Sequence, residues 1–167
     1  MRNNLAQLPF TGRPIEVRYE ANLDDTAGNA AHAATFIRNR LIVLDKELLG
    51  HPKEHSRVLL HELLHFVWVR AGNARRLAWE ELLRKEWLSG ARGECGWSAE
   101  WRKRKLRVKD VDCRTRAWRE YCCESFCDTG AWILGGRNNE VTLGGSHRRI
   151  RQVWFARCFR DRDPVPI

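Results

Sequence analysis

The sequence contains no apolar stretch of the length that crosses a membrane, and no apolar run followed by a small-residue cleavage site near its start. It also lacks internal repeats, low-complexity tracts and the glycine spacing of a phosphate-binding loop. These absences exclude a membrane-spanning chain, a solenoid and a P-loop nucleotide-binding protein. We therefore expect a cytoplasmic protein that has no membrane partner.

A disulfide framework is not expected either, although the sequence has six cysteines. Cys122 and Cys123 are adjacent in a predicted helix and no secretion signal is visible, so we expect reduced thiols. Cys123 and Cys127 share a helical face, where a metal site is one interpretation. Because Cys-x-x-x-Cys without a second cysteine pair is an unusual ligand spacing, we prefer the interpretation that these are small buried apolar side chains.

The length and composition indicate one globular domain. The chain has 167 residues, of which 43% are hydrophobic and 31% charged, so it can bury a core of normal size. The 30 basic residues exceed the 21 acidic ones and give a formal net charge of +9. This excess favours acidic partners, namely nucleic acid or an acidic protein surface.

Strand-like patterns occur in the N-terminal part of the chain. Ile15–Glu20 alternates apolar and polar side chains, which is typical of a half-buried strand. Ala33–Arg38 and Leu41–Leu44 are two β-rich runs on either side of Asn39-Arg40, which indicates a hairpin. Together these runs predict a small antiparallel or mixed sheet. The segments without periodicity, which we expect to be irregular, are residues 1–14 and 24–31.

Helical periodicity dominates the rest of the chain. Pro52 suits a first helical turn and Gly72-Asn73 suits a helix end, so residues 52–71 are expected to form one helix. The further predicted elements are helices over residues 75–90, 115–134 and 147–159, the last capped by Ser146, and a short strand over Val141–Leu143.

The 52–71 helix contains an HExxH motif. His61 and His65 are four residues apart, so their side chains project from one face and can bind one zinc ion. Glu62 can reach a metal-bound water, a geometry that suits hydrolysis. The other residues from Val58 to Val69 are uncharged, and burying three polar side chains among them without a metal or partners would be costly.

A catalytic zinc site needs three protein ligands and one open position. His147 is the only histidine after the motif and is distant in sequence, which favours a carboxylate as the third ligand. In the predicted 115–134 helix, Glu120, Glu124 and Asp128 lie on one face in successive turns. One of them can ligate zinc while the next hydrogen-bonds a ligating histidine and fixes its tautomer. The alternative interpretation is that this acidic stripe is a solvated helix face.

The HExxH motif at residues 61–65, followed by Glu124-x-x-x-Asp128, resembles the gluzincin arrangement of zinc metallopeptidases. The predicted hairpin directly before the HExxH helix is similar to that of the minigluzincins and the ImmA/IrrE-type enzymes. The resemblance covers residues 33–71 and 117–134.

The resemblance implies a single zincin-like, α+β metallopeptidase domain over residues 1–167. The small N-terminal sheet and the central HExxH helix occupy residues 15–73, and a ligand helix and a C-terminal helix occupy residues 115–163. Between them lies a basic, tryptophan-rich insert, residues 74–114, which such small enzymes generally lack.

The resemblance also implies the zinc ligands. His61, His65 and Glu124 would bind one Zn²⁺ per chain, and Asp128 would support one of the ligating histidines. Glu120 remains an alternative ligand, because Glu120-x-x-x-Glu124 has the same spacing. We prefer Glu124, since only this choice leaves an aspartate four residues later.

The implied function is zinc-dependent hydrolysis of peptide bonds in a peptide or protein substrate. Glu62 would act as general base and then as general acid on a metal-bound water. The substrate would add as a strand to Ala33–Arg38 or to Leu41–Leu44. The side chains considered for stabilising the oxyanion are Tyr121, His147, Arg148 and Arg149.

The chain from Trp97 to Arg119 carries nine basic residues, with Trp101 and Trp118 among them. Such a mixture can neutralise phosphates and stack bases. The alternative function is therefore a nucleic-acid-binding protein with a zincin-like core, in which zinc is structural or absent. An acidic protein is the other partner that this charge favours. The competing interpretation of the segment is a helix that buries its tryptophans and exposes its arginines.

Overall fold

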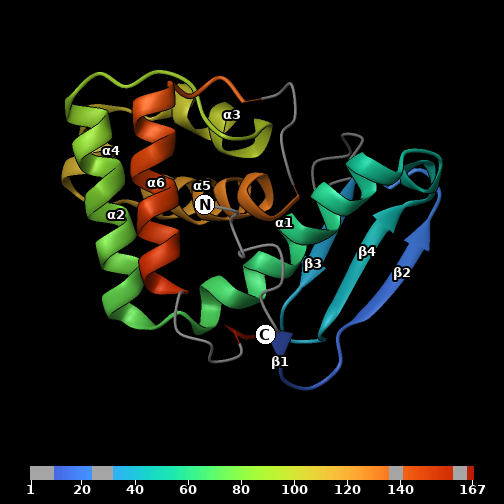
Figure 1. Ribbon diagram of the computed structural model, residues 1–167. Helices are drawn as coiled ribbons and strands as arrows, with labels where there is room; N and C mark the ends of the chain where they lie inside the picture. Colours follow the sequence, from blue (N-terminus) through green and yellow to red (C-terminus); the bar gives the residue numbers. More distant parts are fainter. Residues whose placement is uncertain (1–9, 24–31, 136–140, 160–164) are drawn as a thin grey trace.

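The structure is a computed structural model that describes residues 10–23, 32–135, 141–159 and 165–167 (Figure 1). The described part has the predicted α+β class, with six α-helices and a three-stranded mixed sheet. The irregular segment expected at residues 24–31 lies outside it. In chain order the elements are β1 (Phe10–Thr11), β2 (Glu16–Glu20), β3 (Ala33–Phe36), β4 (Leu41–Asp45), a 3-10 helix (Lys46–Gly50), α1 (Pro52–Arg70), α2 (Gly72–Leu88), α3 (Trp97–Lys105), α4 (Val108–Asp112), α5 (Arg116–Gly135), α6 (Gly145–Cys158) and β5 (Val165–Pro166).

β4 is the central strand of the sheet, whose strand order is β2-β4-β3. β3 and β4 form the predicted antiparallel hairpin, with Phe36 opposite Leu41 and with Arg40 in the left-handed region at a φ of 52°. β2 runs parallel to β4, so the sheet is mixed. Ile42 and Leu44 of β4 are fully buried, because β4 has a neighbour on each edge and also contacts α1.

α1 lies between the sheet and the other helices (Figure 1). It begins at Pro52, as expected from the fixed φ of proline in a first helical turn. It ends at Arg70, and Gly72, with a φ of 75°, redirects the chain so that α2 begins at once. The predicted second helix therefore starts a few residues earlier than expected. Within the described segments, no helix is both long enough and apolar enough to span a membrane.

α5 is the central helix of the C-terminal half and contacts α1, α2, α3 and α6. The ring of Phe126 on α5 meets aromatic rings from three of these helices. The centroid of the Phe126 ring lies 5.2 Å from the ring centroid of Trp68 on α1, 6.0 Å from that of Trp79 on α2 and 4.9 Å from that of Phe155 on α6. This buried aromatic cluster fixes α5 against the helix that carries the HExxH motif.

Three expectations about the chain ends and the start of α6 are wrong. Val141–Leu143 is not a strand, because two of its amides donate to the carbonyl of Glu94 in a loop. Ser146 does not cap α6, because the helix already begins at Gly145. Residues 1–9 of the expected irregular leader lie outside the described residues, and Phe10–Thr11 of the same segment form β1, which pairs in parallel with β5.

A buried ionic network connects α6 with the segment predicted to be an insert. The fully buried guanidinium of Arg151 on α6 lies 2.6 Å from the carboxylate of Glu86 and 2.6 Å from that of Glu94. The hydroxyl of Tyr121 and the ammonium of Lys103 also donate to Glu94, at 2.5 and 3.0 Å. Residues 74–114 therefore supply part of the interior of the domain.

We expect Glu94 to make the protein sensitive to acid. Burial alone raises the pKa of Glu94, but Arg151, and then Lys103 and Tyr121, lower it from 4.5 to about 2. The folded state therefore binds this proton less readily than the unfolded state does. The resulting stabilisation is complete above pH 4.5 and is lost as the pH falls toward 2.

Urea unfolding at several pH values tests this expectation. The unfolding midpoint of the wild type should fall more steeply between pH 4.5 and pH 2 than that of Glu94→Gln. The matched control is Glu81→Gln, which changes a largely exposed side chain and should keep the wild-type slope. Equal slopes for Glu94→Gln and the wild type would contradict the expectation.

Candidate functional site

α1 presents the HExxH residues toward α5 and β3. His61 and Glu62 are buried, and His65 is partly exposed. The two imidazoles lie one helical turn apart, and their ring centroids are separated by 5.0 Å. Imidazoles at this separation can direct one nitrogen each toward a shared ion.

Both ring nitrogens of His61 face carboxylates of α5. Nδ1 lies 2.8 Å from Oδ1 of Asp128, and Nε2 lies 3.2 Å from Oε2 of Glu124. In a tetrahedral zinc site with bonds of about 2.0 Å, two ligand atoms stand about 3.3 Å apart. The separation of Nε2 and Oε2 therefore fits two ligands of one zinc ion, while Asp128 is placed to fix the tautomer of His61.

These carboxylates stabilise positive charge at His61. Burial by itself lowers the pKa of His61, but the charge and hydrogen bond of Asp128, together with Glu124, raise it well above its ordinary value. A carboxylate beside each ring nitrogen suits either a protonated imidazole or an imidazole that binds a cation. The donor set thus fits a metal ion on the Nε2 side of the ring.

Asp128 is itself held by the first turn of α3. Its Oδ2 accepts a hydrogen bond of 2.8 Å from the backbone amide of Ala99. A side chain at Gly96, the residue before α3, would overlap the carboxyl group of Asp128. The segment expected to be an insert therefore supports the aspartate that orients His61, a role that the charge pattern of the segment did not reveal.

Glu124 is partly buried and ionised. Burial raises the pKa of Glu124, but the hydrogen bond from His61 and the charges of His65, His61 and Arg102 lower it to about 2. Its second oxygen, Oε1, lies 3.2 Å from a guanidinium nitrogen of Arg102 on α3. Arg102 therefore fixes Glu124 from the side opposite His61, a contact between α3 and α5 that the sequence pattern did not reveal.

Sulfur atoms lie near His65. The thiol of Cys123 is 3.4 Å from Nδ1 of His65, and His61, His65 and Cys127 offer ligand atoms within 4.8 Å of one another. The only signal of this in the sequence was the shared helical face of Cys123 and Cys127. All six cysteines, each of which lies in a described segment, are free, and Cys122 and Cys127 pack in the core as expected.

Glu62 faces a cleft of about 450 Å³ that is lined by β3, α1, α3 and α5. The hydroxyl of Thr35 on β3 donates a hydrogen bond of 2.6 Å to Oε2 of Glu62. Thr35 was not identified from the sequence, because the contact joins a strand to a helix far along the chain. The cleft is bordered by β3, which is one of the two edge strands of the sheet.

Of the two runs expected to receive a substrate strand, Leu41–Leu44 does not qualify. It forms β4, whose two edges are already paired with β2 and β3. Of these two runs, only Ala33–Arg38 contains a strand, β3, that has an edge without a partner strand among the described residues. β4 has no free edge because β2 pairs with it in parallel. The alternation of side chains along β2 does not reveal which strand it pairs with.

Several other sequence candidates lie away from the cleft. Glu120 is about half exposed and pairs with Arg116 at 2.6 Å. Tyr121 is buried and donates to Glu94. His147, Arg148 and Arg149 belong to α6, which contributes no described residue to the cleft lining. Arg102 is the cation in the cleft lining.

Comparisons of the chain with protein-family models, with curated proteins and with solved structures find no match.

Proposed function

We propose that the protein is a zinc-dependent peptidase in which His61, His65 and Glu124 hold one zinc ion. The observation that carries the proposal is the pair of carboxylates on His61, one within ligand spacing of Nε2 and one hydrogen-bonded to Nδ1. Asp128 keeps a proton on Nδ1, so the lone pair of Nε2 is free for the metal. When bound, zinc would supply an activated water and polarise a carbonyl group.

Cys127 is the competing third ligand, since it lies in the same cluster as the two histidines. Oε2 of Glu124 lies 3.2 Å from Nε2 of His61 and Glu124 lines the cleft, whereas Cys127 is fully buried and does not line it. A catalytic zinc ion needs an open position that a substrate can reach. The proposal therefore assigns Glu124 as ligand and leaves the thiol of Cys127 as a packing group.

Glu62 carries the proton transfers in this proposal. Its carboxylate accepts a proton from the attacking water and then passes it to the nitrogen of the leaving amine, so that one water is consumed for each C–N bond broken. Thr35 donates to one oxygen of this carboxylate and holds its orientation. The other oxygen is then free to exchange the proton.

The free edge of β3 supports an extended peptide as the substrate. A peptide that adds to this edge would run along the cleft beside Glu62, because Ala33, Ala34 and Thr35 all line the cleft. Arg102 also lines the cleft and would face the substrate from α3. We assign it, in place of Tyr121 or His147, as the cation near the developing oxyanion.

Metal analysis tests the ligand assignment. Protein purified without added metal should contain one zinc ion per chain, and this zinc should be lost in His65→Ala and in Glu124→Ala. Glu120→Ala is the matched control on the same helix, and it should keep its zinc because Glu120 points to Arg116. Failure of the wild type to take up zinc even on reconstitution would refute the proposal, and loss of zinc in Cys127→Ala but not in Glu124→Ala would reassign the ligand.

A second candidate function, binding of single-stranded nucleic acid, is favoured by the exposed face of α3. Trp97 and Trp101 are 67% and 43% exposed, and their rings stack with centroids 6.2 Å apart. The ammonium of Lys105 lies 3.3 Å from the ring centre of Trp101. Exposed indoles among cations are typical of base-stacking surfaces. Trp118, which the sequence grouped with these residues, is buried and does not contribute.

Titration with a short oligothymidylate tests this second function. Binding should weaken steeply with salt and fall about fivefold or more in Trp101→Ala, because base stacking contributes about 1–3 kcal/mol per base. Leu88→Ala, at another exposed apolar side chain, is the control. Equal binding by Trp101→Ala and the wild type would exclude α3 as the binding surface.

A further inference from the structure

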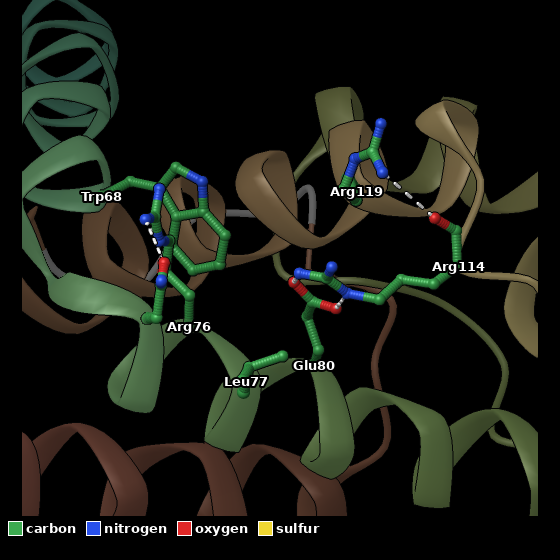
Figure 2. Close-up of a pocket in the computed structure, with 7 residues that line it drawn as sticks. Trp68, Arg76, Leu77, Glu80, Arg114 and Arg119 are labelled. Atoms are coloured by element: carbon green, nitrogen blue, oxygen red, sulfur yellow. Dashed lines mark hydrogen bonds and ion pairs between the residues drawn. The ribbon is translucent and has the colours of Figure 1, made fainter.

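A second hollow, of about 310 Å³, lies where α1, α2 and the start of α5 meet. Three of the residues that line it are arginines, Arg76, Arg114 and Arg119, and we call it the arginine pocket (Figure 2). Figure 2 shows Glu80 between Leu77 and Arg114 in the pocket, with Arg119 near Arg114, while Trp68 and Arg76 line the pocket from α1 and α2. It shares no lining residue with the cleft of the HExxH helix.

Arg114 is firmly held in the pocket. Its guanidinium makes two hydrogen bonds, of 2.5 and 2.8 Å, to the carboxylate of the buried Glu80. Its backbone has a φ of 49°, a left-handed conformation that a residue other than glycine adopts only when its surroundings enforce it. Glu80 is the single acidic residue of the lining, and Arg114 already neutralises it.

The other two guanidiniums bond neutral groups. Arg76 donates to the side-chain amide oxygen of Asn73 at 2.7 Å, and Arg119 donates to the backbone carbonyl of Arg114 at 3.4 Å. These contacts orient both side chains without cancelling their charges. The three arginines and one glutamate of the lining therefore leave two positive charges in the pocket.

The surroundings strengthen the attraction of this charge for an anion. Trp68, which is 9% exposed, and Leu77, which is half exposed, form the apolar part of the lining. Charges beside apolar surface are screened less than charges in open water. Planar guanidiniums bind tetrahedral oxyanions through paired hydrogen bonds, and a phosphate carries close to two negative charges at neutral pH.

We propose that the arginine pocket binds the phosphate group of a small phosphorylated molecule. Arg76 and Arg119 supply the charge that pairs with the phosphate, and the ion pair of Arg114 with Glu80 supplies a fixed side of the site. Trp68 and Leu77 offer apolar contact to the body of the ligand. This binding site is independent of the proposed peptidase activity, since it uses none of the residues assigned to the metal or to proton transfer.

The test is a titration of the ¹⁵N-labelled full chain with inorganic phosphate at constant ionic strength, followed by NMR. Amide resonances at residues 73–80 and 114–119 should shift and saturate. In the double variant Arg76→Gln/Arg119→Gln the affinity should fall by at least about tenfold, because hydrogen bonds to charged groups contribute about 1.5–3 kcal/mol each. Arg149→Gln/Arg157→Gln on α6 is the control, since it removes the same charge from exposed positions.

Comparing the two double variants distinguishes a specific phosphate site from general attraction of phosphate to a basic protein. Equal weakening in the two double variants would mean that net charge alone attracts phosphate, and the proposal would be wrong. The absence of saturable shifts in the wild type would also overturn it. A parallel titration with malonate tests the chemical class: binding as tight as that of phosphate would refute the assignment to phosphate. Arg119→Gln alone, at an exposed side chain, gives a second and milder variant.

Discussion

Replacing Glu62 by glutamine is expected to lower peptidase activity by on the order of 10³-fold while leaving the zinc content unchanged. Glutamine has nearly the shape of glutamate and still accepts the hydrogen bond from Thr35, but it cannot take up the proton of an attacking water. The measurement is the rate of cleavage of a mixture of unstructured peptides, followed by mass spectrometry, together with elemental analysis of the same samples.

The control is Glu54→Gln, which changes another glutamate of α1 that is more exposed and lies outside the cleft. It should keep both activity and zinc. A zinc-loaded Glu62→Gln protein that cleaves peptides at the wild-type rate would show that the proton moves by another route. If the wild type binds zinc but cleaves none of the peptides, the metal assignment stands and the peptidase proposal fails.

Replacing Arg151 by methionine is expected to lower the free energy of unfolding by about 3–5 kcal/mol. The guanidinium is fully buried, and its removal leaves the buried Glu86 without a cation and leaves Glu94 with Lys103 as its remaining ion-pair partner. Urea unfolding at neutral pH measures the loss. Arg149→Met, on an exposed position of the same helix, should change the free energy by less than about 0.5 kcal/mol.

A triple variant separates the loss of charge pairing from the loss of packing. When Glu86→Gln and Glu94→Gln are added to Arg151→Met, most of the lost stability should return, because no carboxylate is then buried without a cation and Lys103, which loses Glu94, is partly exposed. A triple variant as unstable as Arg151→Met would contradict this explanation. The network also holds α3 in place, because Lys103 of α3 donates to Glu94. Arg151→Met should therefore weaken the hydrogen bond from the amide of Ala99 to Asp128, and hydrogen exchange of that amide should become faster.

The sequence predicted the local elements around the site well because their signals are local. Pro52 and Gly72 delimit α1, and the two β-rich runs on either side of Asn39-Arg40 form the hairpin. The spacing of His61 and His65 alone required both imidazoles to lie on one face of a helix. Where the local signal was weak, as at Val141–Leu143, the strand prediction was wrong, because loop contacts with Glu94 determine that segment.

The tertiary structure decided which residues of α5 and β3 meet the HExxH residues of α1. Glu120 and Glu124 lie on the same helix with the same kind of spacing, and only the packing of α5 on α1 brings Glu124, and not Glu120, beside His61. In the same way, the parallel pairing of β2 leaves β3 as the edge strand beside Glu62. These relations join residues that are distant in sequence, and no periodicity along the chain encodes them.

By itself the sequence determined the HExxH and acidic residues that are candidates for chemistry and the elements on which they lie, because residue type and helical or strand period are properties of neighbouring positions. Only the tertiary structure decided which partners they meet. Burial took Tyr121 away from the cleft and into the network of Glu94, and the first turn of α3 brought the amide of Ala99 to Asp128. The physical reason is that burying apolar faces fixes how the helices pack, and the polar side chains at those contacts then pair with whatever lies within hydrogen-bond reach.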